Sequence, residues 1–182
     1  MRKTVTLGPK FELCLTRFEC RSLELWMRSG CPAEKLVAGF AFYGRSMKGV
    51  TGTSIGLGAS FSCKYPCFEP GSFGQEAVYD AQDLIDAENN GGVVGGFCSN
   101  CGGSGFDYYW DDAQSVPWLF NSDKNVFISF DNPRSICIKA RWARDKDLRG
   151  GMFWELAGDD GRLQQVLVDI FVNGVDMDCD SL

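Results

Sequence analysis

The sequence predicts a parallel α/β fold interrupted by a long insertion, and three observations support this prediction. Two continuous apolar segments, KLVAGFAFY (35–43) and MFWEL (152–156), are typical of parallel strands covered on both faces. Helical patterns precede each of these segments and follow the second. Between the two strands, residues 46 to about 128 are long enough to form a small α+β subdomain. The alternation of helices and strands therefore favours parallel α/β architecture.

The elements before the insertion are the end of a helix and a strand. Residues 1–20 show no clear period and are left unassigned. RSLELWMR (21–28) is typical of the end of a helix, because a Ser-Gly pair and then Pro32 follow it. The apolar segment 35–43 follows as the first strand.

The insertion combines short regular elements with glycine-rich stretches. EAVYDAQDLIDAENN (76–90) is predicted to be a helix with an incomplete apolar face. FDYYWDDAQSVPWLF (106–120) and NVFISF (125–130) are typical of short strands with aromatic faces. The remaining stretches, 46–74 and 91–105, are rich in small residues and predict loops.

The part after the insertion has the clearest signals. Either Asp131 or Asn132 can cap a helix whose first turn holds Pro133. This helix covers RSICIKARWARD, and a Gly-Gly pair ends it before the second strand. GDDGRLQQVLVDIF predicts a further helix, whose apolar residues recur at helical spacing: Leu163, Val166, Leu167, Ile170 and Phe171.

The composition of the 182-residue chain excludes several classes of protein. With 45% apolar residues and 14 Phe, the chain is about the size of one domain and can bury a core. The net charge of −6, without a run of basic residues, argues against a nucleic-acid partner. No apolar stretch approaches the roughly 20 residues that span a bilayer, so no membrane partner is expected. The first residues lack the clean apolar core of a secretory signal peptide.

The absence of histidine and the nine cysteines restrict the chemistry further. Without histidine, Ser-His-Asp catalysis and His-ligated zinc are excluded. Four cysteines have a spacing that a zinc site of four thiolates would allow: Cys63, Cys67, Cys98 and Cys101. Disulfides in a secreted, glycine-rich loop region are the favoured alternative. A thioredoxin-type redox motif is less well supported, since FCSNCGG follows a loop and not a strand.

Candidate functional residues lie at the carboxyl ends of the two predicted strands, where function collects in parallel α/β folds. Tyr43 ends the first strand and Arg45 follows it, and Trp154 and Glu155 lie at the end of the second. An exposed Trp beside a carboxylate suits a sugar, because the indole covers the apolar face of a pyranose while charged groups bind hydroxyls and amides. The alternative is that Trp154 belongs to the core and Glu155 caps the next helix.

The segment VNGVDMDCD (172–180) holds three aspartates at alternate positions, Asp176, Asp178 and Asp180. Alternating carboxylates on a short strand are one way to present an acid catalyst. A local interpretation is that Asn173 and Gly174 cap the preceding helix, and that the rest is a solvated acidic tail.

Three stretches closely resemble the last part of a glycoside hydrolase family 18 chitinase: EKLVAGFAFYGRS, YYWDDAQSVPWLF and FISFDNPRSICIKARWARDKDLRGGMFWELAGDDG. The resemblance runs from about residue 22 to 171. It implies a (β/α)8 TIM barrel, of which 21–45 and 129–171 would form the last two βα units. It also implies that 46–128 is the family's α+β insertion domain, which walls one side of the substrate cleft.

The same resemblance implies an activity and a site. Members cleave β-1,4 bonds between N-acetylglucosamine units of chitin or chitooligosaccharides, without metal or cofactor, and the substrate's own acetamido oxygen is the nucleophile. The residues that match substrate-binding positions are Tyr43, Arg45, Met152, Trp154 and Glu155. Trp110 and Asp111 match a family WD pair with a mainly structural role. The resemblance also implies an extracellular protein.

The chain departs from the family pattern at the catalytic acid. The family carries its acid on the fourth strand, in a D-G-x-D-x-D-x-E signature that is upstream of all the matched stretches. VNGVDMDCD resembles this signature, with Asn first and the shorter Asp180 last, so residues 172–182 are either an acidic tail or a degenerate signature strand. Asp176, Asp178 and Asp180 are therefore only weak catalytic candidates, and we expect no hydrolysis by the isolated chain. A chitin-binding, lectin-like module and a cysteine-organised module remain the alternatives.

Overall fold

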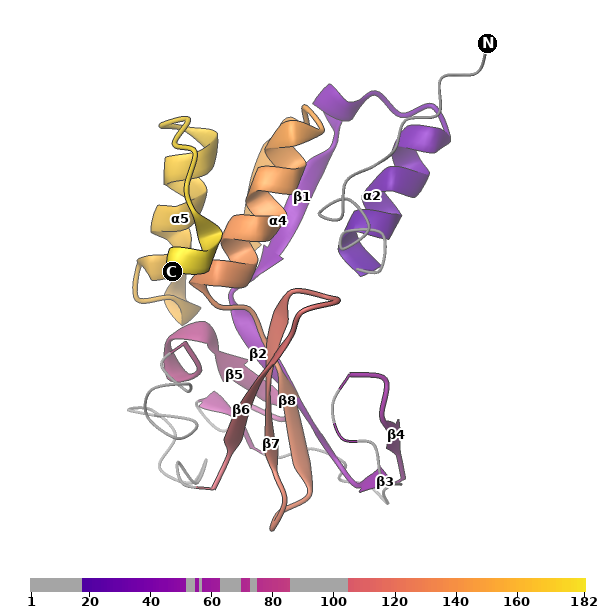
Figure 1. Cartoon of the computed structure of the whole chain (residues 1–182), viewed down its shortest axis with the longest axis vertical. Coiled ribbons are helices and arrows are strands. Elements are labelled where there is room, and N and C mark those ends of the chain that lie inside the picture. The colour runs from indigo at the N-terminus through magenta and orange to yellow at the C-terminus, as the bar shows by residue number, and fades with distance from the viewer. Residues whose placement is uncertain (1–17, 52–54, 56, 63–69, 73–74, 86–104) are drawn as a thin grey trace.

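The computed structural model describes residues 18–51, 55, 57–62, 70–72, 75–85 and 105–182, and it has the predicted α/β character. Figure 1 shows two parts: helices around a long strand in the upper half, and a twisted antiparallel sheet in the lower half. None of the described helices is both long and apolar enough to cross a membrane.

The upper part is built on a parallel pair of strands, β1 (Val37–Ala41) and β9 (Gly150–Trp154), with Val37 opposite Gly150 and Ala41 opposite Trp154. Three helices accompany the pair: α2 (Phe18–Arg28), α4 (Pro133–Asp145) and α5 (Arg162–Phe171). One face of the pair packs on a core that includes Phe40, Ile136, Ala140, Leu163 and Leu167.

The opposite face of the strand pair is exposed in the described part of the chain. Val37, Met152 and Trp154 are all accessible to solvent there, at 46%, 54% and 66% of their surface. The expectation of strands covered on both faces is therefore wrong for these residues. The uncovered face is nevertheless apolar, and two of the candidate site residues, Met152 and Trp154, lie on it.

Helix α4 is capped by Asn132 and not by Asp131. The Asn132 side chain accepts a hydrogen bond from the Ser135 N–H (2.9 Å), and the Ser135 hydroxyl accepts one from the Asn132 N–H (3.0 Å), with Pro133 in the first turn. Asp131 is buried instead and pairs with the Lys139 ammonium at 2.7 Å. This pair ties the last residues before the helix to its second turn.

The lower part is a five-stranded antiparallel sheet with the order β5-β2-β8-β7-β6. Its strands are β2 (Tyr43–Lys48), β5 (Val78–Asp80), β6 (Asp107–Asp111), β7 (Val116–Asn121) and β8 (Val126–Ser129). A further small sheet pairs β3 (Val50–Thr51) with β4 (Ser60–Phe61). The aromatic strands predicted within 106–130 are thus confirmed as β6, β7 and β8.

The helix predicted over 76–90 is wrong in its described portion. Ala77 has a φ of +64°, which is incompatible with a helix, and strand β5 follows, with a short 3-10 helix η3 (Ala81–Asp83) after it. Strand β5 pairs with β2, and the side chain of its middle residue, Tyr79, is buried. Pairing with a distant strand has overridden the local helical pattern. Residues 86–90 lie outside the described residues.

Phe42 joins the two parts of the molecule. Its N–H donates to the carbonyl oxygen of Trp154 (2.8 Å), and its own carbonyl accepts from the N–H of Ala81 (3.1 Å). Its ring is fully buried and stacks on Phe153, with ring centroids 4.7 Å apart. The end of β9, the start of β2 and the end of β5 therefore meet at one residue.

Candidate functional site

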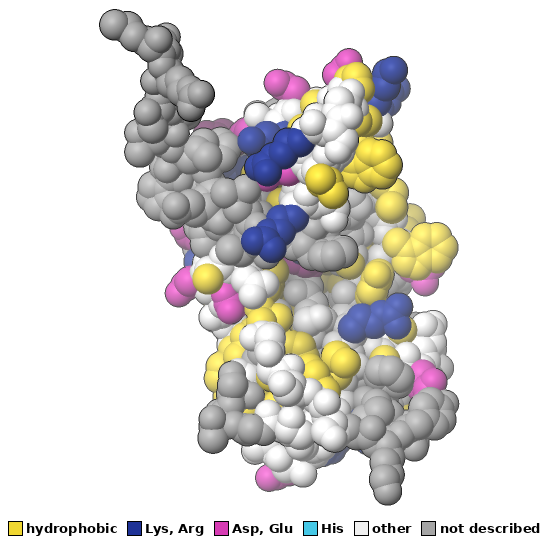
Figure 2. Space-filling model, turned by 90° about the vertical axis from the view of Figure 1, so that its right-hand side faces the viewer, with side chains coloured by type: hydrophobic (Ala, Val, Ile, Leu, Met, Phe, Trp, Pro, Cys, Tyr) yellow, Lys and Arg dark blue, Asp and Glu magenta, His cyan; other side chains and the backbone are white. Residues whose placement is uncertain are grey.

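The residues predicted to form a site lie at or near the carboxyl ends of the parallel strands, and all except the partly buried Tyr43 are exposed. Met152 and Trp154 project from the uncovered face of β9, two residues apart. Trp154 is therefore not a core residue. Glu155 precedes the 3-10 helix η4 (Leu156–Gly158) but makes no side-chain cap hydrogen bond to it, so the capping alternative is also wrong. Figure 2 shows hydrophobic side chains gathered along one edge of the molecule.

Tyr43 and Arg45 reach the same region from the first residues of β2. The Arg45 guanidinium lies over the Tyr43 ring, 5.4 Å from its centroid. Because the residue before Tyr43 is hydrogen-bonded to the Trp154 carbonyl, the start of β2 is fixed beside the end of β9. The fold thus brings Tyr43, Arg45, Met152, Trp154 and Glu155 to one end of the strand pair.

Two acidic residues that sequence reasoning did not select also lie at this end. Asp80 sits opposite Tyr43 in the β2–β5 register. Its backbone N–H donates to the Ser72 hydroxyl (2.8 Å), and that hydroxyl donates to the buried Asp83 carboxylate. A strand interpretation of Val78–Asp80 would have found Asp80, since its alternation places Tyr79 inward and its neighbours outward.

The pKa of Asp80 is raised above its ordinary value. Burial is the largest cause, followed by repulsion from Asp83, while a hydrogen bond from Gln82 acts in the opposite direction and Glu155 adds a smaller repulsion. The repulsion between Asp80 and Glu155 shows that the end of β5 and the residue after β9 bring two carboxylates near each other.

We expect Asp80→Asn to leave stability at pH 7 unchanged or to raise it. Because the folded-state pKa of Asp80 lies above 3.8, its contribution to stability is fully present below pH 3.8 and is lost as pH rises through the folded-state pKa. The advantage of the amide over the carboxylate should therefore shrink as the pH falls toward 4. Thermal melts from pH 4 to 8 measure this difference.

The exposed turn residue Asp123 offers a matched control for that series. Asp123→Asn should give a melting temperature that differs little from that of the parent at every pH. A variant of Asp80 that loses stability at pH 7, by an amount that grows with pH, would contradict the expected sign.

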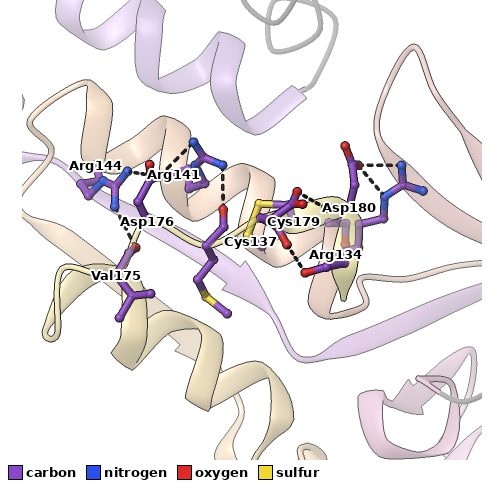
Figure 3. The surroundings of a disulfide bond; sticks show 12 residues. Arg134, Cys137, Arg141, Arg144, Val175, Asp176, Cys179 and Asp180 are labelled. Atoms are coloured by element: carbon purple, nitrogen blue, oxygen red, sulfur yellow. Dashed lines mark hydrogen bonds and ion pairs between the residues drawn. A yellow bond between two sulfur atoms is a disulfide. The ribbon is translucent and has the colours of Figure 1, made fainter.

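The three aspartates of the C-terminal segment do not join this group. Asp176 and Asp180 contact arginines of helix α4 (Figure 3), whereas Trp154 lies on the exposed face of β9. Asp176 pairs with Arg141 (3.0 Å), Asp180 pairs with Arg134 (2.8 Å), and the Asp178 side chain accepts from the Asp180 N–H. Their carboxylates are engaged in contacts on the helical side of the molecule.

The segment does not form the strand that a catalytic signature would require. Residues 174–178 have no regular secondary structure and lead into a 3-10 helix, η5 (Cys179–Ser181). The local interpretation is confirmed in its first half, because Asn173 donates to the Asp169 carboxylate (2.9 Å) and Gly174 has a φ of +67°. The solvated-tail interpretation holds for the three aspartates, which are exposed, but not for Cys179, which is buried and bonded to Cys137.

No group of three or more potential metal ligands occurs among the residues that the structure describes. The four cysteines considered for zinc, Cys63, Cys67, Cys98 and Cys101, lie outside the described residues. Disulfide formation itself is present at a pair that the spacing did not indicate, Cys137 and Cys179.

Comparison with known proteins decides the family. The model of the glycosyl hydrolases family 18 matches residues 17–159. The chain belongs to glycosyl hydrolase family 18. It is 34% identical over 141 residues to chitinase A1 of Niallia circulans, covering 75% of this chain and 17% of that relative. It is also 31% identical over 163 residues to chitinase B of Serratia marcescens, covering 86% of this chain and 32% of that relative.

The fold of this family 18 chain is similar to that of solved chitinases. Chitinase ChiA74 from Bacillus thuringiensis superposes with a TM-score of 0.67 at 26% sequence identity, over 87% of this chain and 26% of that structure. The family 18 chain thus spans a third or less of the length of these three relatives.

Proposed function

We propose that this family 18 chain supplies the chitin-binding part of a glycosidase site and does not hydrolyse chitin by itself. One observation carries the proposal: an exposed Trp154 stands at the carboxyl end of the parallel pair, directly before Glu155 and beside the start of β2, which carries Tyr43 and Arg45. The proposed ligand is a β-1,4-linked chain of N-acetylglucosamine, the class on which the related chitinases act by name.

The chemistry of the group fits this ligand. A pyranose presents an apolar face of C–H groups that an indole can cover, and Trp154 with Met152 offers about the right combination of flat and flexible apolar surface. Arg45 and the carboxylates of Asp80 and Glu155 can hydrogen-bond the hydroxyl and acetamido groups at the sugar's rim. This combination of a stacking surface with polar groups at its edge is what a carbohydrate site requires.

The described residues contain no recognisable catalytic acid. Family 18 hydrolysis uses the substrate's acetamido oxygen as nucleophile and still requires an acid to protonate the leaving oxygen. The sequence contains no D-G-x-D-x-D-x-E segment, and Asp176 and Asp180 are paired with arginines of α4. We therefore infer that the acid comes from residues other than those described.

The uncovered strand face supports a barrel origin of the site. In a (β/α)8 barrel, one face of each strand packs on helices and the other fills the interior. On β1 the helix-facing Ala38 and Phe40 are buried, and on β9 Phe153 packs partly buried against the same core. Val37, Met152 and Trp154 on the other face are exposed. We propose that β1 and β9 are the last two strands of such a barrel, that residues 46–128 are its insertion domain, and that the protein is extracellular, the compartment in which disulfides such as Cys137–Cys179 form.

A test of the proposal measures binding and turnover together. We expect the chain to bind chitotetraose in titration calorimetry and to leave a fluorogenic chitobioside uncleaved. Cellotetraose, which has the same linkage without acetamido groups, should bind at least tenfold more weakly. Hydrolysis by the purified chain would overturn the non-catalytic part of the proposal, and failure to bind chitotetraose would overturn the proposal as a whole.

A non-catalytic, lectin-like module is the second candidate, and the engagement of the tail aspartates with arginines favours it. The two candidates predict different behaviour once the missing barrel strands are supplied. A fusion that places the first six βα units of chitinase B before residue 18 should hydrolyse the chitobioside if the chain is part of an enzyme site. A folded fusion that binds chitotetraose without cleaving it would favour the lectin-like module.

A further inference from the structure

The C-terminal segment 174–181 is fastened to helix α4 by a disulfide and by arginine contacts (Figure 3). It leaves the end of α5, runs along α4 from Arg144 toward Arg134 and ends in η5. None of the proposed sugar contacts involves it. Its sequence, with aspartates on both sides of a cysteine, therefore requires a different explanation.

Helix α4 presents a single stripe of side chains to this segment. The members of the stripe are Arg134, Cys137, Arg141 and Arg144. Their spacing of three, four and three residues places them on one face of an α-helix. Three guanidinium groups thus flank one sulfur, and the acidic segment is complementary to this arrangement.

Arg141 and Arg144 hold the first half of the segment. Arg141 donates to the carbonyl oxygen of Met177 (2.7 Å) and pairs with the Asp176 carboxylate (3.0 Å). Arg144 donates to the carbonyl oxygen of Val175 (3.1 Å) and lies 3.5 Å from the same carboxylate. Both arginines therefore contact the backbone and one aspartate together.

Arg134 holds the second half and connects it to the antiparallel sheet. Its Nε and Nη2 lie 3.2 Å and 2.8 Å from one oxygen of Asp180. The same guanidinium lies over the ring of Trp110 in β6, 4.1 Å from the centroid. Arg134 thus contacts both Asp180 of the segment and Trp110 of the antiparallel sheet.

These polar contacts are too exposed to hold the segment by themselves. The side chains of Asp176 and Asp180 keep 75% and 67% of their surface accessible. Ion pairs at such exposure contribute little, because water and salt screen them. The buried anchor of the segment is Cys179, bonded to the fully buried Cys137 over a separation of 42 residues. Met177 also packs against the core that holds both cysteines. The disulfide is the covalent link that adds to these contacts, and we take it as the dominant hold on the segment.

We propose that residues 174–181 form a redox-controlled clasp on α4. A dithiol reductant breaks the Cys137–Cys179 bond by thiol–disulfide exchange: the two sulfurs take up two electrons and two protons, and the dithiol becomes a disulfide. The segment then leaves the arginine stripe and exposes it to solvent. The parallel pair and the antiparallel sheet keep their structure, because neither contains the bond.

Hydrogen exchange of the full chain tests the clasp. In Cys137→Ala/Cys179→Ala, which removes this bond without touching other cysteines, we expect the protection of amides in 174–182 to fall at least tenfold. Amides of β2 and β8 should change less than twofold. Arg141→Gln/Arg144→Gln with the disulfide intact is the matched control, and it should retain the protection of the segment within about threefold.

A second measurement keeps the test independent of how well the cysteine variant folds. In the unchanged protein, titration with dithiothreitol should make Cys137 and Cys179 accessible to iodoacetamide while the circular dichroism spectrum of the fold persists. Two outcomes would overturn the clasp. One is a segment that stays protected without the disulfide, and the other is equal loss of protection in the antiparallel sheet, which would make the bond a staple of the whole fold.

Discussion

Trp154→Ala is expected to remove most of the affinity for chitooligosaccharides while leaving the fold intact. The indole is 66% exposed, so its removal forfeits little buried surface within the chain. Truncation of a central aromatic contact in a binding site typically costs about 2 kcal/mol or more, roughly a thirtyfold increase in Kd. Calorimetric titration with chitotetraose measures the change in Kd, and thermal denaturation measures the change in stability.

The chain offers a closely matched control in Trp26. This residue lies on α2 and is 62% exposed, nearly the same as Trp154, but it is not at the carboxyl end of the strands. Trp26→Ala should leave the Kd within about twofold of the parent value. Trp154→Phe should recover part of the affinity, since a smaller aromatic ring can still cover a pyranose. Equal losses for Trp26→Ala and Trp154→Ala would contradict a specific role of the strand-end tryptophan.

The parts of the fold that local sequence determines were predictable. Helix α4 follows from a capping box and Pro133, and α5 follows from its amphipathic repeat, since both signals lie within a few residues of the element they define. Strand β5 was missed because its conformation depends on pairing with β2, more than 30 positions earlier in the sequence.

The candidate site divides in the same way. Tyr43, Arg45 and Trp154 could be selected as candidates because the ends of apolar strands are visible in the sequence. Asp80 was missed together with the strand that carries it. The exposure of one face of β1 and β9 could not be predicted from their apolar residues, because burial depends on what the rest of the fold places there. The Cys137–Cys179 pairing likewise cannot be deduced from spacing among nine cysteines.

The junction at Phe42 is where we expect the largest effect on stability. Phe42→Ala removes a fully buried ring that stacks on Phe153 and packs into the core between the helices and the strand pair. Such truncations typically cost about 3–5 kcal/mol, which is a large share of the roughly 5–15 kcal/mol by which domains are stable. Urea denaturation followed by circular dichroism measures the change in the free energy of unfolding.

The consequences of Phe42→Ala should also reach the sugar site. Phe153 directly precedes Trp154, and the backbone of Phe42 holds both the Trp154 carbonyl and the Ala81 N–H. A cavity beneath Phe153 loosens the support of the indole, so the affinity for chitotetraose should fall under conditions where the variant is still folded. Phe42→Leu fills part of the same space and should show smaller losses of both stability and affinity. The contrary outcome is that Phe42→Ala lowers stability without changing the Kd of the folded protein. The stack on Phe153 would then matter for the core alone. The orientation of Trp154 would in that case depend on the backbone hydrogen bond from Phe42, which the substitution preserves.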